Sequence, residues 1–349
     1  MRAIGAGLVS ARRRAGRALL YLALLGGLAA CGGGGGADAG QGLRVCLVTN
    51  SDGLAPHSLN QLAAAGARGA APSVQLIESH AASDYLGNLQ RCAATRADLI
   101  VAVSSDMATA VWRSAQLHTN LHYALVDAIP IDDNGQPAEL NNVAELLFKV
   151  QEPGYLTGVL AGLIEKQKIG SATHNTLGIL GFNHSPAVDP YIAGYVAGAR
   201  AVDPTVAFKV TYSDSQDPAF CKQLGITQIS GGADILFEVT EHCASGYIDA
   251  AYDASAYAIG SDVDDAYLSP AVISSAIKRV DRAVALTIQQ IAAGKFKAGK
   301  QLFGLKEDAV TFSTPSSVVP QDIINQVLDR KASIRSGSLT PSDTIPPGI

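Results

Sequence analysis

Short apolar runs alternate with amphipathic segments along most of the chain. The first run, residues 43–49, is rich in β-branched side chains and is typical of a buried strand. Turn-forming residues follow at 50–56, and apolar side chains then recur at helical spacing from Ser58, a candidate N-cap. This stretch predicts a strand, a loop and a helix, with the loop at the carboxyl end of the strand, where open α/β sheets bind ligands.

The alternation continues in two successive series. Further strands are predicted at residues 74–78, 99–103, 122–126, 142–149, 176–181, 208–212, 235–239, 257–259, 303–305 and 309–312, the last two as a pair. Helices are predicted at residues 82–95, 107–115, 151–166, 192–202, 220–230, 246–252, 272–293 and 321–335. Strands that alternate with helices form parallel sheets covered on both faces. The pattern therefore predicts an α/β fold with two Rossmann-like lobes, the arrangement of a type I periplasmic binding protein.

The two series set the expected domain boundaries. We expect lobe 1 to comprise residues 43–150 plus 260–300, and lobe 2 to comprise 151–258 plus 305–336. A polar, Pro-rich tail follows at 337–349. Hinge crossovers between the lobes are expected near residues 148–152, 256–260 and 303–305.

The residues before the predicted fold have the features of a targeting segment. A basic stretch and a short apolar stretch end at Leu28-Ala29-Ala30-Cys31, which resembles a bacterial lipobox. We expect residues 1–31 to be a lipoprotein signal peptide and Cys31 to carry the lipid, followed by a Gly-rich tether at residues 32–42. The protein would then be anchored to a membrane and face the periplasm or the cell exterior. The alternative is a plain signal peptide with an incidental cysteine.

Removal of the signal changes the charge of the chain. The signal contains five arginines, so its removal lowers the number of Lys and Arg residues from 26 to 21, while the 31 Asp and Glu residues remain. The mature protein therefore has a net charge of 21 − 31 = −10. Such an acidic protein is a poor partner for nucleic acid.

Four cysteines remain after the signal, and an even number in an exported protein suggests disulfides. Cys46, early in the first strand, and Cys92, late in the helix before the third strand, are expected at the same sheet edge. Cys221 opens a helix and Cys243 follows the next parallel strand, so these two also share one end of a layer. We expect the pairs Cys46–Cys92 and Cys221–Cys243, with four reduced, buried thiols as the alternative.

The sequence offers little support for a phosphate-binding loop, a serine hydrolase site or a metal site. The loop at residues 50–60 lacks the Gly-rich phosphate-binding patterns, and the chain has no Gly-x-Ser-x-Gly nucleophile elbow. His118 and His122 have the spacing of a helical metal pair, but their segment resembles a loop that enters a strand, so we expect surface histidines. The cluster Asp262, Asp264 and Asp265 could hold a divalent cation, although we favour hydroxyl binding and a solvated turn. We expect no cofactor.

The motifs from about Val45 to Phe312 resemble the basic membrane protein family of substrate-binding lipoproteins, the purine-nucleoside-receptor type of ATP-binding-cassette importers. The motifs are Ser58-Leu59-Asn60-Gln61 with Gly66, Tyr123-Ala124-Leu125-Val126-Asp127, Tyr155-Leu156-x-Gly158-x-x-Ala161-Gly162, Leu177-Gly178-Ile179-Leu180-Gly181 with Gly194-Tyr195-x-x-Gly198, Ile259-Gly260-Ser261-Asp262-x-Asp264, and Ser274-Ser275-x-x-Lys278-Arg279-Val280-Asp281. Their order and spacing together are specific.

The resemblance implies a cleft between the lobes that binds a purine nucleoside or a related ligand. Asn60, Asp127, Asp262 and Lys278 match the family's polar contacts, with the carboxylates placed to accept hydrogen bonds from ribose hydroxyls. Asn50 stands where the family has an aspartate, and we include it in the predicted site. A loop or capping role for each aspartate, and a solvated helix charge for Lys278, are the alternatives.

The chain departs from the family pattern at several positions. The family's stacking Phe is Leu59 here, and its Gly-rich second-lobe loop is replaced around residues 241–246. Loss of one stacking ring changes the expected base selectivity. Phe182, Phe237 and Trp112 are candidates to supply another ring, with a core position as the alternative for each.

These observations favour a transport receptor that closes on a small polar ligand and delivers it to the permease subunits of the importer. The alternatives are an exported enzyme that acts on a nucleoside on the same scaffold, and a sensor that reports the ligand to a membrane partner.

Overall fold

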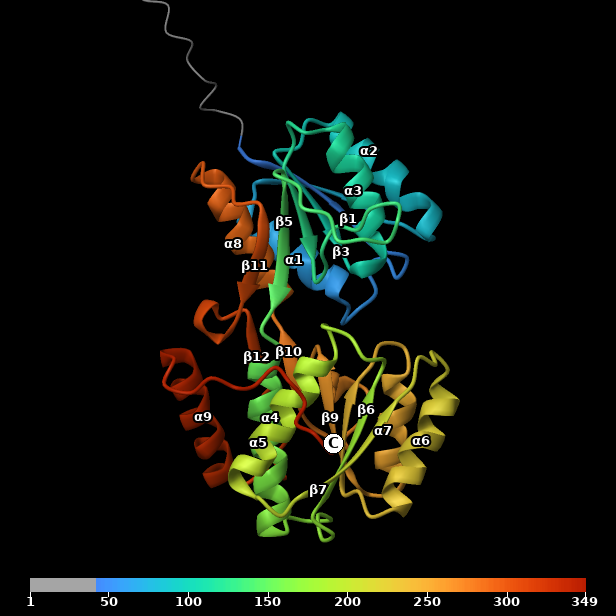
Figure 1. The fold of residues 1–349 in the computed structure, drawn as a ribbon, viewed down its shortest axis with the longest axis vertical. Helices are drawn as coiled ribbons and strands as arrows, with labels where there is room; N and C mark the ends of the chain where they lie inside the picture. Colours follow the sequence, from blue (N-terminus) through green and yellow to red (C-terminus); the bar gives the residue numbers. More distant parts are fainter. Residues whose placement is uncertain (1–41) are drawn as a thin grey trace, which may run out of the picture. The chain divides into compact units, whose positions relative to one another are not determined.

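The computed structural model describes residues 42–349, which form two α/β lobes (Figure 1). The signal, Cys31 and all but the last residue of the tether lie outside the described residues. No helix within residues 42–349 has the length and apolar character needed to cross a bilayer.

Lobe 1 is built on a six-stranded, fully parallel sheet with the order β11-β5-β4-β3-β1-β2. Its strands are β1 (Arg44–Val48), β2 (Ser73–Ile77), β3 (Leu99–Val103), β4 (Tyr123–Val126), β5 (Val143–Phe148) and β11 (Gly299–Phe303). Its helices are α1 (Leu59–Ala70), α2 (Tyr85–Ala94), α3 (Ala108–Leu117) and α8 (Val280–Ala292). Because successive side chains of a strand point to opposite faces, Val45 and Leu47 pack on the side of α1 and α8, and Cys46 and Val48 on the side of α2 and α3.

Lobe 2 repeats this design with the order β12-β10-β9-β8-β6-β7, in which only β12 runs antiparallel to its neighbour among the described strands. Its strands are β6 (Thr176–Gly181), β7 (Ala207–Tyr212), β8 (Ile235–Val239), β9 (Tyr257–Asp262), β10 (Val272–Lys278) and β12 (Val310–Phe312). Its helices are α4 (Gln151–Gln167), α5 (Asp189–Val202), α6 (Pro218–Ser230), α7 (Ala244–Asp253) and α9 (Gln321–Ser336). Helices α4 and α5 cover one face of this sheet, and α6 and α7 cover the other (Figure 1).

The prediction of one helix over residues 272–293 was wrong. Residues 272–278 form β10, a buried strand between β9 and β12, and the helix α8 begins only at Val280. A short apolar run such as Val-Ile-Ser-Ser-Ala-Ile has no periodicity that separates a buried strand from a buried helix, so hydrophobicity alone does not decide. The strand assignment follows from its pairing with β9.

This strand moves the expected domain boundary. Residues 257–278 belong to the sheet of lobe 2, so the chain returns to lobe 1 after Lys278 and not near residue 260. The predicted crossover at 256–260 is corrected accordingly, while the chain does pass between the sheets after Phe148 and after Phe303. The two late strands are not a pair, because β11 pairs with β5 in lobe 1 and β12 pairs with β10 in lobe 2.

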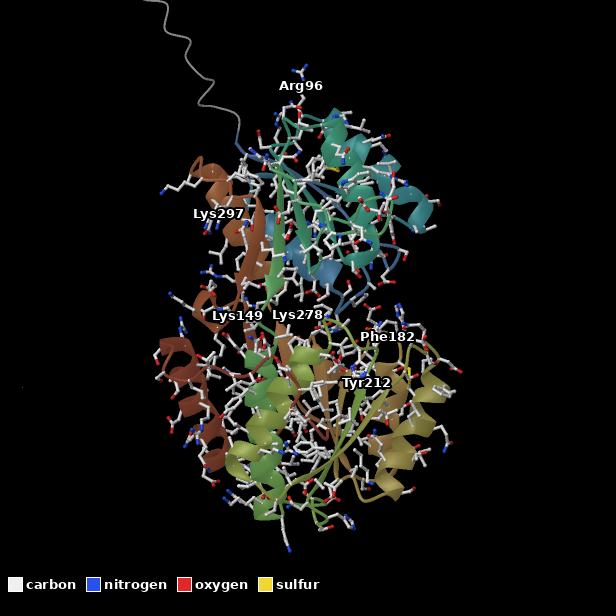
Figure 2. All side chains as sticks on the ribbon, in the orientation of Figure 1. Arg96, Lys149, Phe182, Tyr212, Lys278 and Lys297 are labelled. Atoms are coloured by element: carbon white, nitrogen blue, oxygen red, sulfur yellow. A yellow bond between two sulfur atoms is a disulfide. The ribbon has the colours of Figure 1, made fainter. Side chains whose placement is uncertain are left out.

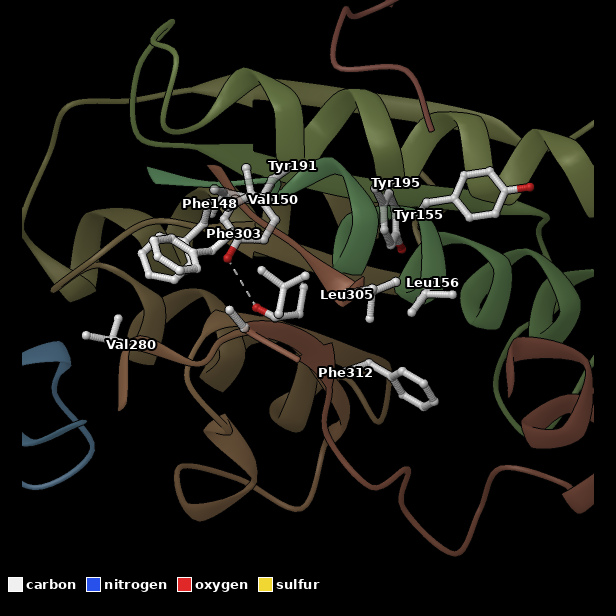
Figure 3. Close-up of a cluster of buried hydrophobic side chains, with 14 of the residues drawn as sticks. Phe148, Val150, Tyr155, Leu156, Tyr191, Tyr195, Val280, Phe303, Leu305 and Phe312 are labelled. Carbon is white, nitrogen blue, oxygen red and sulfur yellow. Dashed lines mark hydrogen bonds between the residues drawn. The ribbon is translucent and has the colours of Figure 1, made fainter. Parts of the chain in front are cut away.

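The crossings are packed against one another. Phe148 and Phe303 end neighbouring strands in register, their ring centroids lie 6.2 Å apart, and the Lys149 amide donates to the Phe303 carbonyl at 2.8 Å. Figure 3 shows these rings beside Val150, the second residue after β5. In the same view the Tyr191 hydroxyl donates to the carbonyl of Ala276 at 3.4 Å, which ties α5 to β10.

Both disulfides expected from the sequence are present. Cys46 of β1 bonds Cys92 of α2 with the Cα atoms 5.6 Å apart, and Cys221 of α6 bonds Cys243, the N-cap of α7, at 5.8 Å. The second bond joins the start of α7 to α6, and Cys243 itself lies within the segment at residues 241–246 that departs from the family pattern. It therefore restricts the motion of that segment.

Candidate functional site

A cavity of about 320 Å³ lies where the carboxyl ends of strands from both sheets meet. Lobe 1 contributes the loop after β1 and the end of β3, and lobe 2 contributes the ends of β8 and β9 with their following loops. The side chains that line it include Asn50, Asp52, His57, Asn60, Glu238, Glu241, His242, Ser261, Asp262, Asp265 and Tyr267. This is the edge at which the sequence predicts ligand binding.

A second cavity of similar volume lies beside His184 and Tyr212, where the tail from Asp343 to the last residue packs against lobe 2 (Figure 2). It contains none of the predicted site residues.

Asn60 organises the loop after β1. Its buried amide nitrogen donates to Asn50 Oδ1 at 2.5 Å and to the Gly53 carbonyl at 2.8 Å, and its Oδ1 accepts from the Asn50 amide at 3.4 Å. Ser58 is the N-cap of α1, as predicted, and accepts from the Gln61 amide. Asn50 and Asn60 both line the cavity, but most of the hydrogen-bonding groups of their side chains are bonded to each other or to the loop. Their main role is therefore to fix the conformation of the loop that lines the cavity.

Lys278 joins the two lobes. It ends β10, its side chain is 3% exposed, and its Nζ lies 2.6 Å from Asp127 Oδ2, at the end of β4, and 2.9 Å from Asp262 Oδ1, at the end of β9. Burial alone would lower the pKa of Lys278, but the charges of Asp127 and Asp262 outweigh it and raise the pKa above its ordinary value. The ammonium therefore stays charged between two carboxylates that come from different lobes.

This arrangement changes the roles predicted for Asp127 and Lys278 but not the role predicted for Asp262. Asp127 and Lys278 do not line the cavity, and they are engaged with each other across the lobe boundary. Asp262 does line it, with its side chain 26% exposed. The partners of its carboxylate, Lys278 and the Tyr191 hydroxyl at 2.9 Å, both use Oδ1, which leaves Oδ2 without a partner among residues 42–349.

The predicted aromatic residues do not reach the cavity. Phe237 is fully buried in β8 and stacks on Tyr195 with centroids 4.4 Å apart, so it is a core residue. Phe182 packs, half-buried, against the same core, and neither it nor Trp112 of α3 lines the cavity. The correction for Phe237 has a simple cause: it faces α4 and α5, while its neighbour Glu238 points to the opposite face of the sheet.

The rings at the cavity are His57 and Tyr267, which the sequence prediction missed. They come from lobe 1 and lobe 2 and stack directly on each other at the cavity wall, with centroids 3.8 Å apart and planes 10° apart. Tyr267 ends the short 3₁₀ helix η3 (Asp265–Tyr267) after β9. A second contact between the lobes joins His242 Nε2 to Asp52 Oδ1 at 3.7 Å.

Glu238 was also missed, and Asp265, which was expected in a solvated turn, is only 4% exposed. Glu238 is 1% exposed; its Oε2 accepts from the Thr240 amide and hydroxyl at 2.9 and 2.7 Å, and its Oε1 accepts from the Ser261 amide at 2.8 Å. Burial raises the pKa of Glu238 to about 7. Burial, with the charges of Glu238 and Asp262, raises the pKa of Asp265 to about 9. A glutamate inside the apolar strand Ile-Leu-Phe-Glu-Val was the signal available in the sequence.

The metal candidates are not supported. Nowhere in the described part of the chain do three or more His, Cys, Asp or Glu side chains form a group that could hold a metal ion. His122 stacks on Phe296 with centroids 4.1 Å apart.

The fold and the cavity define a class of proteins. A solved ABC transporter solute-binding protein from Aeropyrum pernix K1 matches with a TM-score of 0.69 and 23% identity, covering 85% of this chain and 92% of that one. Two α/β lobes with six-stranded sheets form the fold of type I periplasmic binding proteins, and this chain has that fold.

Residues 63–342 match the Bmp family, which is described as ABC transporter substrate-binding protein PnrA-like. The chain belongs to this family. The CD4+ T-cell-stimulating antigen of Listeria monocytogenes is 27% identical, over 84% of this chain and 87% of its own. The ABC transporter nucleoside-binding protein BmpA of Lactococcus lactis is 24% identical, over 85% of this chain and 88% of its own. This is a family of extracytoplasmic substrate-binding proteins and not of enzymes, which removes the enzyme alternative.

Proposed function

We propose that this protein binds a nucleoside-like small polar ligand in the cavity between its lobes and delivers it to the permease of its ABC transporter. The observation that carries the proposal is Asp262, whose carboxylate lines the cavity at the carboxyl end of β9 and keeps Oδ2 free of protein partners among the described residues. A carboxylate oxygen accepts a hydrogen bond from a sugar hydroxyl. The resemblance to the nucleoside-binding BmpA supports this ligand class.

The three crossings support binding by hinge closure. They follow Phe148, Lys278 and Phe303, and each connects elements of different sheets over a few residues. Small backbone rotations at such element ends separate two lobes without disturbing either sheet. In the structure the stacked rings of His57 and Tyr267 and the Asp127–Lys278 ion pair hold the lobes together, which is the contact set expected of a closed form.

Asp262→Asn tests the ligand class. The substitution keeps the shape and the acceptor for Lys278 but removes the charge from the hydrogen bond to a ribose hydroxyl. We expect the Kd for adenosine or guanosine to rise at least about tenfold, because a charge-assisted bond contributes about 1.5–3 kcal/mol. Binding of adenine or guanine, which lack the hydroxyls, should barely change. Isothermal titration calorimetry measures both.

Asp264→Asn is the matched control, since Asp264 is exposed, lies two residues away and does not line the cavity. It should leave both affinities unchanged. Equal weakening of nucleoside and base by Asp262→Asn would make Asp262 a structural residue, and failure of every nucleoside to bind the wild type would reject the proposed ligand class.

We also propose that the protein is anchored through a lipid on Cys31, on the basis of the lipobox-like Leu-Ala-Ala-Cys sequence. Cys31→Ser should block modification, so an uncleaved precursor without lipid is expected. Metabolic labelling with a fatty-acid analogue and fractionation of membranes measure the change. Cleavage and membrane association that are unaltered in the variant would reject the anchor.

A further inference from the structure

The cavity wall is acidic from both lobes. Asp52 comes from lobe 1, and Glu238, Glu241, Asp262 and Asp265 come from lobe 2. With pKa values of about 9 and about 7, Asp265 is protonated at neutral pH and Glu238 is only partly ionised, so the negative charge of the wall comes mainly from the other three side chains. No lysine or arginine of residues 42–349 lines the cavity, and the nearby Lys278 is already held by two aspartates. The basic side chains in the wall are the histidines His57, stacked on Tyr267, and His242, beside Asp52.

A second observation points to a ligand at the same wall. Ser261, between Gly260 and Asp262 at the end of β9, is 4% exposed and lines the cavity, and its Oγ has no hydrogen-bond partner among the described residues. A buried hydroxyl without a partner is disfavoured, so a polar group of the ligand is expected to satisfy it. The amide of Ser261 donates to Glu238 Oε1 at 2.8 Å, and Asp262 is the next residue in the chain, so carboxyl groups flank this position.

Closure increases the repulsion within this wall. Burial and the charges of Asp262 and Asp52 raise the pKa of Glu241, although His242 opposes them. Asp52 and Glu241 line the same cavity from different lobes, so their like charges approach each other only when the lobes meet. A positive charge in the cavity would turn this repulsion into attraction and would favour the closed form.

We infer that the ligand of this cavity carries a protonated amino group in addition to hydroxyl groups, and that Asp52 of lobe 1 with Glu241 and Asp262 of lobe 2 selects for that charge. The inference rests on the proposed function in taking the cavity as the ligand site. An ammonium group has three donors and no acceptor, which matches a wall of carboxylate oxygens. Glu241 lies in the loop that replaces the family's Gly-rich sequence, so the selectivity belongs to this chain and not to the motifs it shares.

Three nucleosides that differ at one group provide the test. Adenosine, 5′-amino-5′-deoxyadenosine and 3′-amino-3′-deoxyadenosine are titrated calorimetrically into the full protein at neutral pH, with putrescine as an amine that lacks a nucleoside. At least one amino nucleoside should bind about tenfold or more tightly than adenosine. The preference should shrink several-fold in Glu241→Gln and in Asp52→Asn, two exposed positions on opposite lobes.

Glu139→Gln is the control, because Glu139 is exposed in lobe 1 and does not line the cavity; it should retain the full preference. Adenosine binding as tightly as both amino nucleosides overturns the inference and leaves the proposed function intact. Binding of putrescine without any of the nucleosides rejects the nucleoside proposal and overturns the hydroxyl part of the inference, while its selectivity for a positive charge stands. Failure of all four compounds to bind overturns both.

Discussion

Lys278→Met is expected to lower the free energy of unfolding by about 3–5 kcal/mol, the usual effect of removing one partner from a buried ion pair. Lys278 Nζ contacts Asp127 at 2.6 Å and Asp262 at 2.9 Å, and the lysine side chain is 3% exposed. Methionine fills the space but leaves two carboxylates facing each other with no cation between them. One of them belongs to lobe 1 and the other to lobe 2, so their repulsion acts directly on the lobe boundary.

Urea denaturation followed by circular dichroism measures this loss. The exposed Lys306, which forms no salt bridge within residues 42–349, supplies the control Lys306→Met, and its effect should stay within about 0.5 kcal/mol. Adding Asp127→Asn to Lys278→Met should recover part of the stability, because it removes one of the uncompensated charges. A loss below about 1 kcal/mol for Lys278→Met, or no recovery in the double variant, would show that the triad is not a stabilising unit.

The fold was predictable because its signals are local. Each strand such as Leu99–Val103 is a compact apolar run followed by polar turn residues, and several of the intervening helices, such as α3, have an apolar stripe. The fully buried stretch at 272–278 lacked such a stripe, and there the prediction failed. The error also displaced the predicted lobe boundary. Because β10 was taken as part of a helix, the return of the chain to lobe 1 was predicted near residue 260, whereas it follows Lys278.

The site was predictable only in part because it depends on contacts that are distant in sequence. The resemblance to the family identified Asp127, Asp262 and Lys278, but no sequence pattern indicates that Lys278 and Asp127, 151 residues apart, satisfy each other. Nor does a pattern show that His57 meets Tyr267, because that pairing needs both lobes in place. Phe237 and Glu238 illustrate the remaining limit: a shift of one residue along a strand separates the core from the opposite face.

Gly158→Ala is expected to destabilise the protein by about 3 kcal/mol or more, at or above the usual upper end for overpacking. Helices α4 and α5 pack backbone to backbone, and a Cβ on Gly158 would overlap the carbonyl oxygen of Tyr195. Gly154 and Gly198 meet carbonyls of the facing helix in the same way. A backbone carbonyl within a helix cannot rotate aside, so the two helices would have to separate.

The same substitution at Gly87 supplies a control of opposite sign. Gly87 lies inside α2, and a Cβ added there would meet no neighbouring atom within 4 Å, so alanine should raise stability by about 0.5–1 kcal/mol through helix propensity. Denaturation curves of the two variants therefore separate packing from propensity. Because α5 also carries Tyr191, which donates to Asp262 at 2.9 Å, displacement of this helix should weaken ligand binding as well. Stabilisation by both substitutions would contradict the close packing of α4 against α5.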